Sequence, residues 1–410
     1  MTATTEPPRA GFRLSLLIRD TRYRAITIQV LALAVTAAVL YWLGWNTTRN
    51  LAAMGKQIDF SFIWGRAGYD ISQTLIPYTA DSTHARAALV GVLNTLLVSA
   101  LAIVLATVIG VFVGVLRLSN NWLVARLMTV YVEVFRNVPL LLWILLIGAI
   151  VIGAAPEPRA FRDGTASMIL GSTVAVSNRG IFIPAPVIGP GAGWLALVVV
   201  LSIAAALLWR WRARRILYTS GRMVPVLWPA LALLVLPGLA VWAGFTLAEG
   251  EPLAFDVPAI AETGIPRFVG GMQLRGSLLA LWLALSLYTA SHIAENVRGG
   301  ILAISRGQTE AAHALGLRSG RTMQLVILPQ ALRVIVPPLI SQYLNIIKNS
   351  SLGLAVGYMD LRSTLGGITI NQTGRELEGM LLLGLFYLVI SLIISGGMNL
   401  YNNHVRLRER

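Results

Sequence analysis

Eight long apolar runs divide this 410-residue sequence, and they limit what it can fold into. A helix needs about 20 consecutive apolar residues to cross the hydrocarbon core of a bilayer. A mean hydropathy of +0.71 also leaves too few polar residues to cover a water-soluble globule. The runs occupy residues 25–45, 88–116, 127–152, 194–209, 224–245, 277–293, 335–358 and 380–400. We therefore predict an all-α polytopic membrane protein with about eight transmembrane helices.

Basic residues beside these runs set the expected orientation. The formal net charge is +15, and every basic residue except Lys56 and Lys348 is an arginine. The most basic tract contains no acidic residue, and its arginines are Arg210, Arg212, Arg214, Arg215 and Arg222. Arginine-rich loops remain in the cytosol, so we expect both termini to be cytosolic. Charge that is scattered beside membrane segments in this way indicates topology rather than nucleic-acid binding.

The second run contains small residues at a regular spacing. Ala106, Gly110 and Gly114 are each four positions apart, so they fall on one face of a helix. Small residues in this pattern allow two helix backbones to approach closely. We expect a tight helix–helix contact along this face.

Missing residues exclude several kinds of active site. The sequence has no cysteine, which excludes disulfides, thiolate metal sites and cysteine nucleophiles. Its four histidines are isolated, without a metalloprotease or serine-hydrolase motif. A phosphate-binding loop needs Gly-Lys followed by Ser or Thr, but Lys56 is followed by Gln57 and Lys348 follows Ile347. We expect this chain to be no enzyme and to bind no metal or cofactor.

A polar segment between the sixth and seventh runs carries its own helix signals. Ser305, with Gln308 three positions later, forms a capping-box start. Gly316 is placed to close the turn after this first short helix. Ser319 is expected to cap a second short helix, which Pro329 then kinks or stops. The segment is predicted to be a helical hairpin.

This hairpin resembles the EAA loop, the signature of the membrane subunits of ABC-type importers. The matching positions are Glu310, Ala311, Ala312, Gly316, Leu328 and Pro329. The usual pattern has an isoleucine two positions before the leucine, where this chain has Val326 followed by Ile327. The resemblance implies that residues 305–329 form a coupling helix. Such a helix sits in a groove on a separate ATPase subunit and converts its closure into movement of the membrane helices.

Longer stretches narrow the resemblance to the polar amino-acid permeases of ABC uptake systems. The matching segments are GVLNTLLVSA, YVEVFRNVPLL, SLYTASHIAENVRGGILAISRGQTEAAHALGL, LPQALRVIVPPLISQYLNIIKNSSL and MNLYNNHVRLRER. They are most similar to the longer permease subunit of the general L-amino-acid systems (Aap or Bzt type) of Gram-negative bacteria. The resemblance implies a type I ABC importer permease core in two parts, 88–153 and 274–410. Residues 1–87 would add an N-terminal helix, and residues 154–273 an inserted helix pair with periplasmic loops.

The function that this resemblance implies is import of L-amino acids from periplasm to cytoplasm across a bacterial inner membrane. The implied partners are two ATP-binding cassette subunits holding ATP and Mg, a homologous permease forming a heterodimer, a periplasmic amino-acid-binding protein and membrane lipid. No nucleic acid is among them. The alternative is an ion-coupled secondary amino-acid transporter. It is disfavoured because such transporters usually have paired, interrupted helices in two symmetric halves, whereas the coupling loop occurs once here.

Polar residues within or at the ends of the runs are candidates for the translocation path, because such groups are costly in lipid. The candidates are Glu133, Arg136, Asn137, Glu295, Arg298, Lys348, Asn349 and Ser350. In each of the two Glu–Arg pairs the residues are three positions apart, on one helical face near the cytosolic end. They either neutralise each other as local ion pairs or line the lower cavity and its gate. A cavity with both signs of charge and several amides would suit an amino acid.

Overall fold

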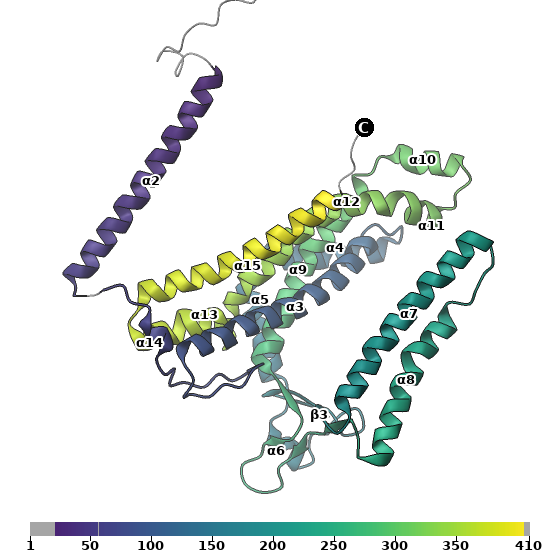
Figure 1. Ribbon diagram of the computed structural model, residues 1–410, viewed down its shortest axis with the longest axis horizontal. Helices are drawn as coiled ribbons and strands as arrows, with labels where there is room; N and C mark the ends of the chain where they lie inside the picture. Colours follow the sequence, from purple (N-terminus) through teal and green to yellow (C-terminus); the bar gives the residue numbers. More distant parts are fainter. Residues whose placement is uncertain (1–20, 56, 406–410) are drawn as a thin grey trace, which may run out of the picture.

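The protein is described by a computed structural model that covers residues 21–55 and 57–405. Helices make up most of it (Figure 1). The expected cytosolic N-terminal arginines Arg9, Arg13 and Arg19 and the basic tail at 406–410 lie outside the described residues. In the described part, eight helices are long and apolar enough to cross a membrane. The predicted number of transmembrane helices is therefore confirmed.

Most of the main helices extend beyond the predicted apolar runs at one end or at both. They are α2 (Thr21–Ala53), α3 (His84–Leu116), α4 (Trp122–Asn137), α5 (Leu140–Gly153), α7 (Ala192–Ser220), α8 (Leu227–Ala248), α9 (Gly276–Leu302), α12 (Leu328–Asn349) and α15 (Glu376–Val405). Short helical turns connect some of them, namely η1 (Ser61–Trp64), η3 (Ser350–Val356), α13 (Leu361–Ser363), η4 (Thr364–Thr369) and α14 (Ile370–Thr373).

The third predicted run, 127–152, is two helices rather than one. Helix α4 ends at Asn137 and α5 begins at Leu140. Proline has no N–H to donate and disfavours helical dihedrals in the residue before it. Val138 accordingly adopts extended dihedrals (φ −104°, ψ 133°) immediately before Pro139. The candidate membrane span of this region begins with α5 at Leu140 and runs on to Arg162, and α4 is a separate amphipathic helix capped by the side chain of Asn121.

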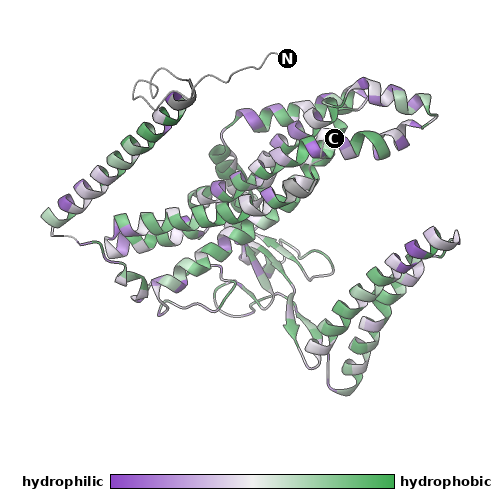
Figure 2. Cartoon of the chain, turned by 45° about the horizontal axis from the view of Figure 1, so that its top comes forward, coloured by the Kyte–Doolittle hydropathy of each residue, from purple (hydrophilic) through white to green (hydrophobic). Residues whose placement is uncertain are grey.

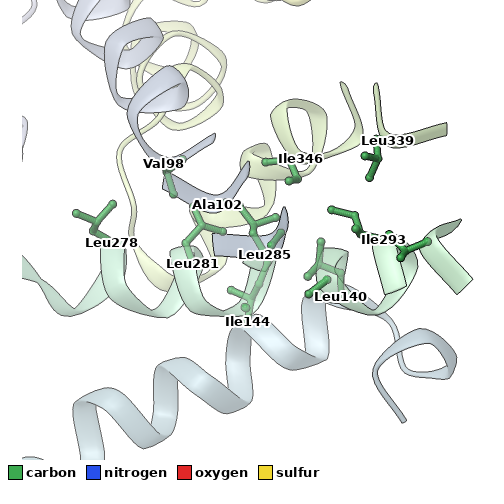
Figure 3. Close-up of a cluster of buried hydrophobic side chains, with 14 of the residues drawn as sticks. Val98, Ala102, Leu140, Ile144, Leu278, Leu281, Leu285, Ile293, Leu339 and Ile346 are labelled. Atoms are coloured by element: carbon green, nitrogen blue, oxygen red, sulfur yellow. The ribbon is translucent and has the colours of Figure 1, made fainter. Parts of the chain in front are cut away.

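Helix α9 is the centre of the helical bundle. In α9, 67% of the residues in the apolar stretch that would cross the membrane are buried within the protein. In α2 and α8 the corresponding share is 0%. Leu281, Leu285 and Ile293 of α9 pack among Val98 and Ala102 of α3, together with residues of α5 and α12 (Figure 3). A helix enclosed by other helices on most sides has its environment set by protein rather than lipid. Helix α9 therefore positions α3, α5 and α12 relative to one another.

The predicted small-residue contact is confirmed on α3. Ala106 is fully buried, and a Cβ atom added at Gly110 would lie 2.6 Å from the Cβ of Ile293. At Gly114 an added Cβ would lie 2.7 Å from the backbone oxygen of Ala294. These distances are shorter than real carbon contacts. The backbones of α3 and α9 thus approach each other as closely as glycine allows.

Three helices stand outside this bundle. Helix α2 lies apart on one side, and α7 and α8 form an antiparallel hairpin on another (Figure 1). Both groups are largely hydrophobic along their length (Figure 2). Their large apolar side chains are exposed in the chain alone, for example Leu33 and Leu208. These surfaces are of the kind that faces lipid. The division into a core and added segments remains a prediction.

The loops expected to be periplasmic within residues 154–273 contain short strands, the last of which continues to Arg275, and these strands were not predicted. They are β1 (Ala175–Ser177), β2 (Gly180–Ile183), β3 (Ala185–Ile188), β4 (Leu253–Asp256), β5 (Ala259–Ile260), β6 (Phe268–Val269) and β7 (Met272–Arg275). A short helix, α6 (Pro158–Arg162), precedes them. The strands form antiparallel sheets β1-β2-β7, β3-β4 and β5-β6, with Ile181 opposite Leu274. Strand β7 leads directly into α9, so the largest of these sheets is fixed to the start of the central helix.

The α3–α9 contact generates a stability prediction. We expect Gly110→Ala to lower the free energy of unfolding by about 1–3 kcal/mol, because the methyl group has no space against α9. Gly299→Ala in α9 is the matched control, since nothing lies within 4 Å of an added Cβ there. It should be neutral or stabilising by up to about 1 kcal/mol. Thermal unfolding midpoints of the two variants in detergent test this. Equal midpoints would contradict the close-contact interpretation.

Candidate coupling hairpin and translocation site

The first arm of the predicted hairpin is α10 (Arg306–Ala314). Gly316 follows it with φ +76°, in the left-handed region that favours glycine. The amide of Gly316 donates to the oxygen of His313 (2.9 Å), and that of Leu317 donates to the oxygen of Ala312 (3.1 Å). This pair of bonds is a Schellman motif, which satisfies the last carbonyls of a helix. The predicted turn at Gly316 is confirmed.

The capping prediction is only half right. Ser305 occupies the N-cap position of α10, but its side chain makes no capping hydrogen bond. The Gln308 side chain instead accepts a hydrogen bond from Nε2 of Gln330, at 3.2 Å. Gln330 belongs to the second arm of the hairpin. The expected local bond is therefore replaced by one that joins the two arms.

Pro329 was expected to kink or stop the second arm, and the structure shows that it does not stop it. Helix α11 (Ser319–Thr322) continues through a π-helical turn, η2 (Met323–Ile327), directly into α12. Arg318, rather than Ser319, is the N-cap residue. A proline inside a helix leaves a carbonyl without its usual donor, and a π turn shifts the hydrogen-bond pattern from i+4 to i+5. The amide of Leu328 accordingly donates to the oxygen of Met323. The hairpin is thus continuous with a membrane span.

The hairpin presents a small, open surface. Glu310, Ala311 and Gly316 are exposed, while Ala312 is buried beneath them. Leu315 at the tip is 82% exposed. Leu328 and Pro329 are also exposed at the base of the second arm. Helices α10 and α11 lie together at one end of the molecule, beside the C-terminal end of α15 (Figure 1). Small side chains around one carboxylate leave room for another protein surface to approach.

A charge cluster lies at the same end of the bundle, around Glu295 of α9. Its carboxylate pairs with Arg117, which follows α3, and with Arg298 of α9 at 2.5 Å. Arg136 of α4 is 3.9 Å away. The Arg117 side chain is only 9% exposed, so its charge depends on this partner. One carboxylate therefore joins the ends of α3, α4 and α9, and the local charge remains positive.

Only one of the two predicted local ion pairs forms. Glu295 and Arg298 pair as expected, but Glu133 does not pair with Arg136. Oε2 of Glu133 instead accepts a hydrogen bond from Nδ2 of Asn137 at 3.2 Å, with both residues exposed. Arg136 lies nearest to Glu295 instead, at 3.9 Å from its Oε2 atom. The sequence reading missed Arg117, although its position at the end of a span was a signal.

The three neighbouring path candidates Lys348, Asn349 and Ser350 differ in how far they are buried. Lys348 is exposed, Asn349 is half-buried and Ser350 is buried, with its hydroxyl donating to the oxygen of Ile347 at 2.8 Å. Ser341, Asn345 and Lys348 recur at helical spacing, and all three are exposed in the chain alone. They form a polar stripe along one face of α12. Lipid would be an unfavourable neighbour for this stripe.

A buried polar junction holds the opposite end of the bundle. Oη of Tyr358 donates to the oxygen of Asn94 (2.8 Å), and Nδ2 of Asn94 donates to the oxygen of Met359 (2.9 Å). The nearby Asp360 carboxylate caps α13 by accepting from the amide and hydroxyl of Ser363. Burial raises the pKa of Asp360 above its usual range, although the Ser363 hydrogen bonds act in the opposite direction. The sequence reading did not identify this junction.

Taken together, these features define a membrane subunit of a multi-component transport system. The spans surround a central helix, and a helical hairpin continuous with one span is exposed for another protein. The family model for the binding-protein-dependent transport system inner membrane component matches residues 198–407, and the chain belongs to this family. It is therefore an inner-membrane permease subunit of the ABC-transporter type.

Curated relatives match over almost the whole chain. The permease protein BztB of a glutamate/glutamine/aspartate/asparagine transport system from Rhodobacter capsulatus is 54% identical, covering 100% of both chains. The general L-amino acid transport system permease protein AapQ of Rhizobium johnstonii is 42% identical over 99% of this chain and 98% of its own. YhdX of Escherichia coli, described as a putative amino-acid ABC transporter permease, is 43% identical over 98% of this chain and 99% of its own. The resemblance to the Aap and Bzt type is confirmed.

The charge cluster gives a second stability prediction. Glu295→Gln should lower the free energy of unfolding by about 1–3 kcal/mol, because the charge-assisted hydrogen bonds to Arg117 and Arg298 are lost. Glu133→Gln changes an exposed carboxylate with one hydrogen bond, and should stay within about 0.5 kcal/mol of the wild type. Thermal unfolding of the purified chain compares them. A loss of equal size in both variants would show that the cluster has no special role.

Proposed function

We propose that this permease subunit imports L-amino acids from periplasm to cytoplasm, driven by ATP hydrolysis in a partner. The observation that carries the proposal is the exposed hairpin whose second arm is continuous with α12. The full-length relatives are named as permeases for amino acids, which supports the substrate class. Membership in a binding-protein-dependent family favours this function over an ion-coupled secondary transporter.

The hairpin is suited to transmit movement. A groove in the ATPase subunit would hold α10, with Glu310 placed to pair with a basic group of the partner. Movement of α10 would pass into α12 through the unbroken second arm, and into α9 through the few residues between Leu302 and Arg306. The Glu295 cluster would carry the displacement of α9 to the ends of α3 and α4. These helices would then open or close the cytosolic side of the path.

The proposed assembly contains two ATP-binding subunits, which hold ATP and Mg, and a homologous permease as the second half of a heterodimer. A periplasmic amino-acid-binding protein would deliver substrate at the end opposite the hairpin, with both termini of this chain cytosolic. The polar stripe Ser341, Asn345 and Lys348 would face the partner permease or the path between the two subunits. There a lysine and amides can bind the carboxylate and ammonium groups of an amino acid. Membrane lipid would cover the outer helices.

The hairpin is tested by ATP-dependent uptake of radiolabelled L-amino acids into vesicles containing the whole assembly. We expect uptake to require ATP and the binding protein, and to fall by roughly tenfold or more in Glu310→Ala or Gly316→Val, because ATPase docking is weakened. Glu376→Ala is the control, since it removes an exposed carboxylate at the start of α15. Unchanged ATPase co-purification and uptake in both hairpin variants would contradict the coupling role. Uptake driven by a proton or sodium gradient without ATP would favour the secondary transporter.

The path is tested at Lys348. Its side chain is exposed in the chain alone, so we expect Lys348→Ala to leave the protein level near that of the wild type. Uptake should fall by roughly tenfold, as expected when a charge-assisted hydrogen bond to substrate is lost. Lys348→Arg retains the charge and should recover part of the uptake. Parallel losses of protein level and transport would instead assign Lys348 a structural role.

A further inference from the structure

The far end of the α7–α8 hairpin has a geometry that transport does not explain. Nε1 of Trp209 donates to the oxygen of Pro225 at 3.3 Å, which places Trp209 level with the residues just before α8. Helix α7 nevertheless continues to Ser220. At 1.5 Å per residue, its last turns extend about 16 Å past Trp209. The sequence reading treated this stretch as a loop, but it is a projecting helix end.

Four arginines surround the projecting end, and we call them the arginine collar. They are Arg210, Arg212, Arg214 and Arg215, and all four are exposed. At 100° per residue they spread around three sides of the helix, whereas Ala213 on the remaining side is buried. No aspartate or glutamate occurs between Ala192 and Ala248. Within the described ranges, the ion pairs of this chain do not include the collar.

The surroundings of the collar are those of a membrane interface. Leu207 and Leu208, just before it, are 61% and 64% exposed, as expected for side chains in hydrocarbon. Trp209 and Trp211 follow, and tryptophans concentrate at the boundary between hydrocarbon and headgroups. The guanidinium of Arg215 lies 5.5 Å from the centre of the Trp211 ring. Figure 2 shows this change from hydrophobic to hydrophilic residues along the hairpin. The collar therefore lies at headgroup level.

We propose that the arginine collar binds the headgroups of anionic phospholipids in the cytosolic leaflet. Guanidinium groups bind phosphate oxygens with two parallel hydrogen bonds, and clusters of four or more basic residues beside a span attract anionic lipid. A protein partner is less suited, because the collar spreads around three sides of a projecting helix end rather than forming one flat or concave face. The main contacts of α7 and α8 are with each other, so lipid can reach the collar from three sides.

The proposal is independent of the transported substrate, and it gives the inserted hairpin a task. A helix pair whose main contacts are internal has little to fix its depth in the membrane. Phosphate contacts on three sides would hold α7 at a set depth and keep the hairpin beside the permease. The collar would then act as an anchor in lipid rather than as part of the transport path.

The test counts bound lipids on the full chain by native mass spectrometry, with phosphatidylglycerol or phosphatidylcholine added to the purified protein. The collar variant replaces all four arginines with glutamine. The external control makes the same change at four exposed arginines on the opposite side, namely Arg66, Arg159, Arg179 and Arg267. Each collar arginine is expected to contribute about fivefold to binding of the anionic lipid. The preference for phosphatidylglycerol should fall by roughly a hundredfold or more in the collar variant and by less than about twofold in the control.

Removing cytosolic arginines can also invert a membrane hairpin, so a second variant replaces the four collar arginines with lysine. It keeps the positive charge and should keep the orientation, which a Ser220→Cys thiol reports because the chain has no other cysteine. Lysine cannot form the two parallel bonds, so we expect a smaller but measurable loss of preference. An unchanged preference in both collar variants would overturn the proposal. So would an equal fall in the external control, or binding of the ATPase rather than lipid by the collar.

Discussion

The close approach of α3 to α9 is the contact on which the rest of the structure depends. Within a membrane, helices gain little by hiding apolar side chains from one another, because lipid tails are equally apolar. Close packing of the helix backbones is then a main source of stability, and Gly110 and Gly114 make it possible. Once α9 is held against α3, its other faces are available to α5 and α12. The bundle is thus organised around a contact made by residues with almost no side chain.

The same two helices are joined again by polar groups at the end that carries the coupling hairpin. Glu295 draws Arg117 and Arg298 together, and this ion pairing is stronger at a partly buried site than it would be in water. At the other end, Tyr358 and Asn94 connect α3 to the segment after α12. Glycine packing along the middle and the Glu295 ion pair at one end leave α3 and α9 little freedom to slide. Movement in this bundle is therefore more readily a tilt of whole helices than a shift along their axes.

The features that could be predicted from sequence are those written in local patterns. The lengths of the apolar runs predicted the number of membrane spans. The four-residue spacing of small residues predicted the contact of α3 with another helix, and Gly316 predicted the turn of the coupling hairpin. The misses depend on distant or compensating contacts. Arg136 pairs with Glu295 rather than with nearby Glu133, and Pro329 is accommodated by a π turn that no residue signals. The strands pair segments from 175–183 and 272–275, which lie on either side of a helix hairpin in the sequence. The roles of the path residues remain predictions, because they depend on chains other than this one.

The unbroken run from α11 through η2 into α12 makes this part of the permease a lever. From Ser319 to Asn349 it is about 46 Å long at the usual helical rise. A tilt of roughly 5° at one end would displace the other by about 4 Å, which is comparable to the width of a methylene chain. Prolines 337 and 338 lie within this lever and could bend it, so its stiffness is not uniform. The direction in which Lys348 travels would then be set near Pro337, far from the surface where the force is applied.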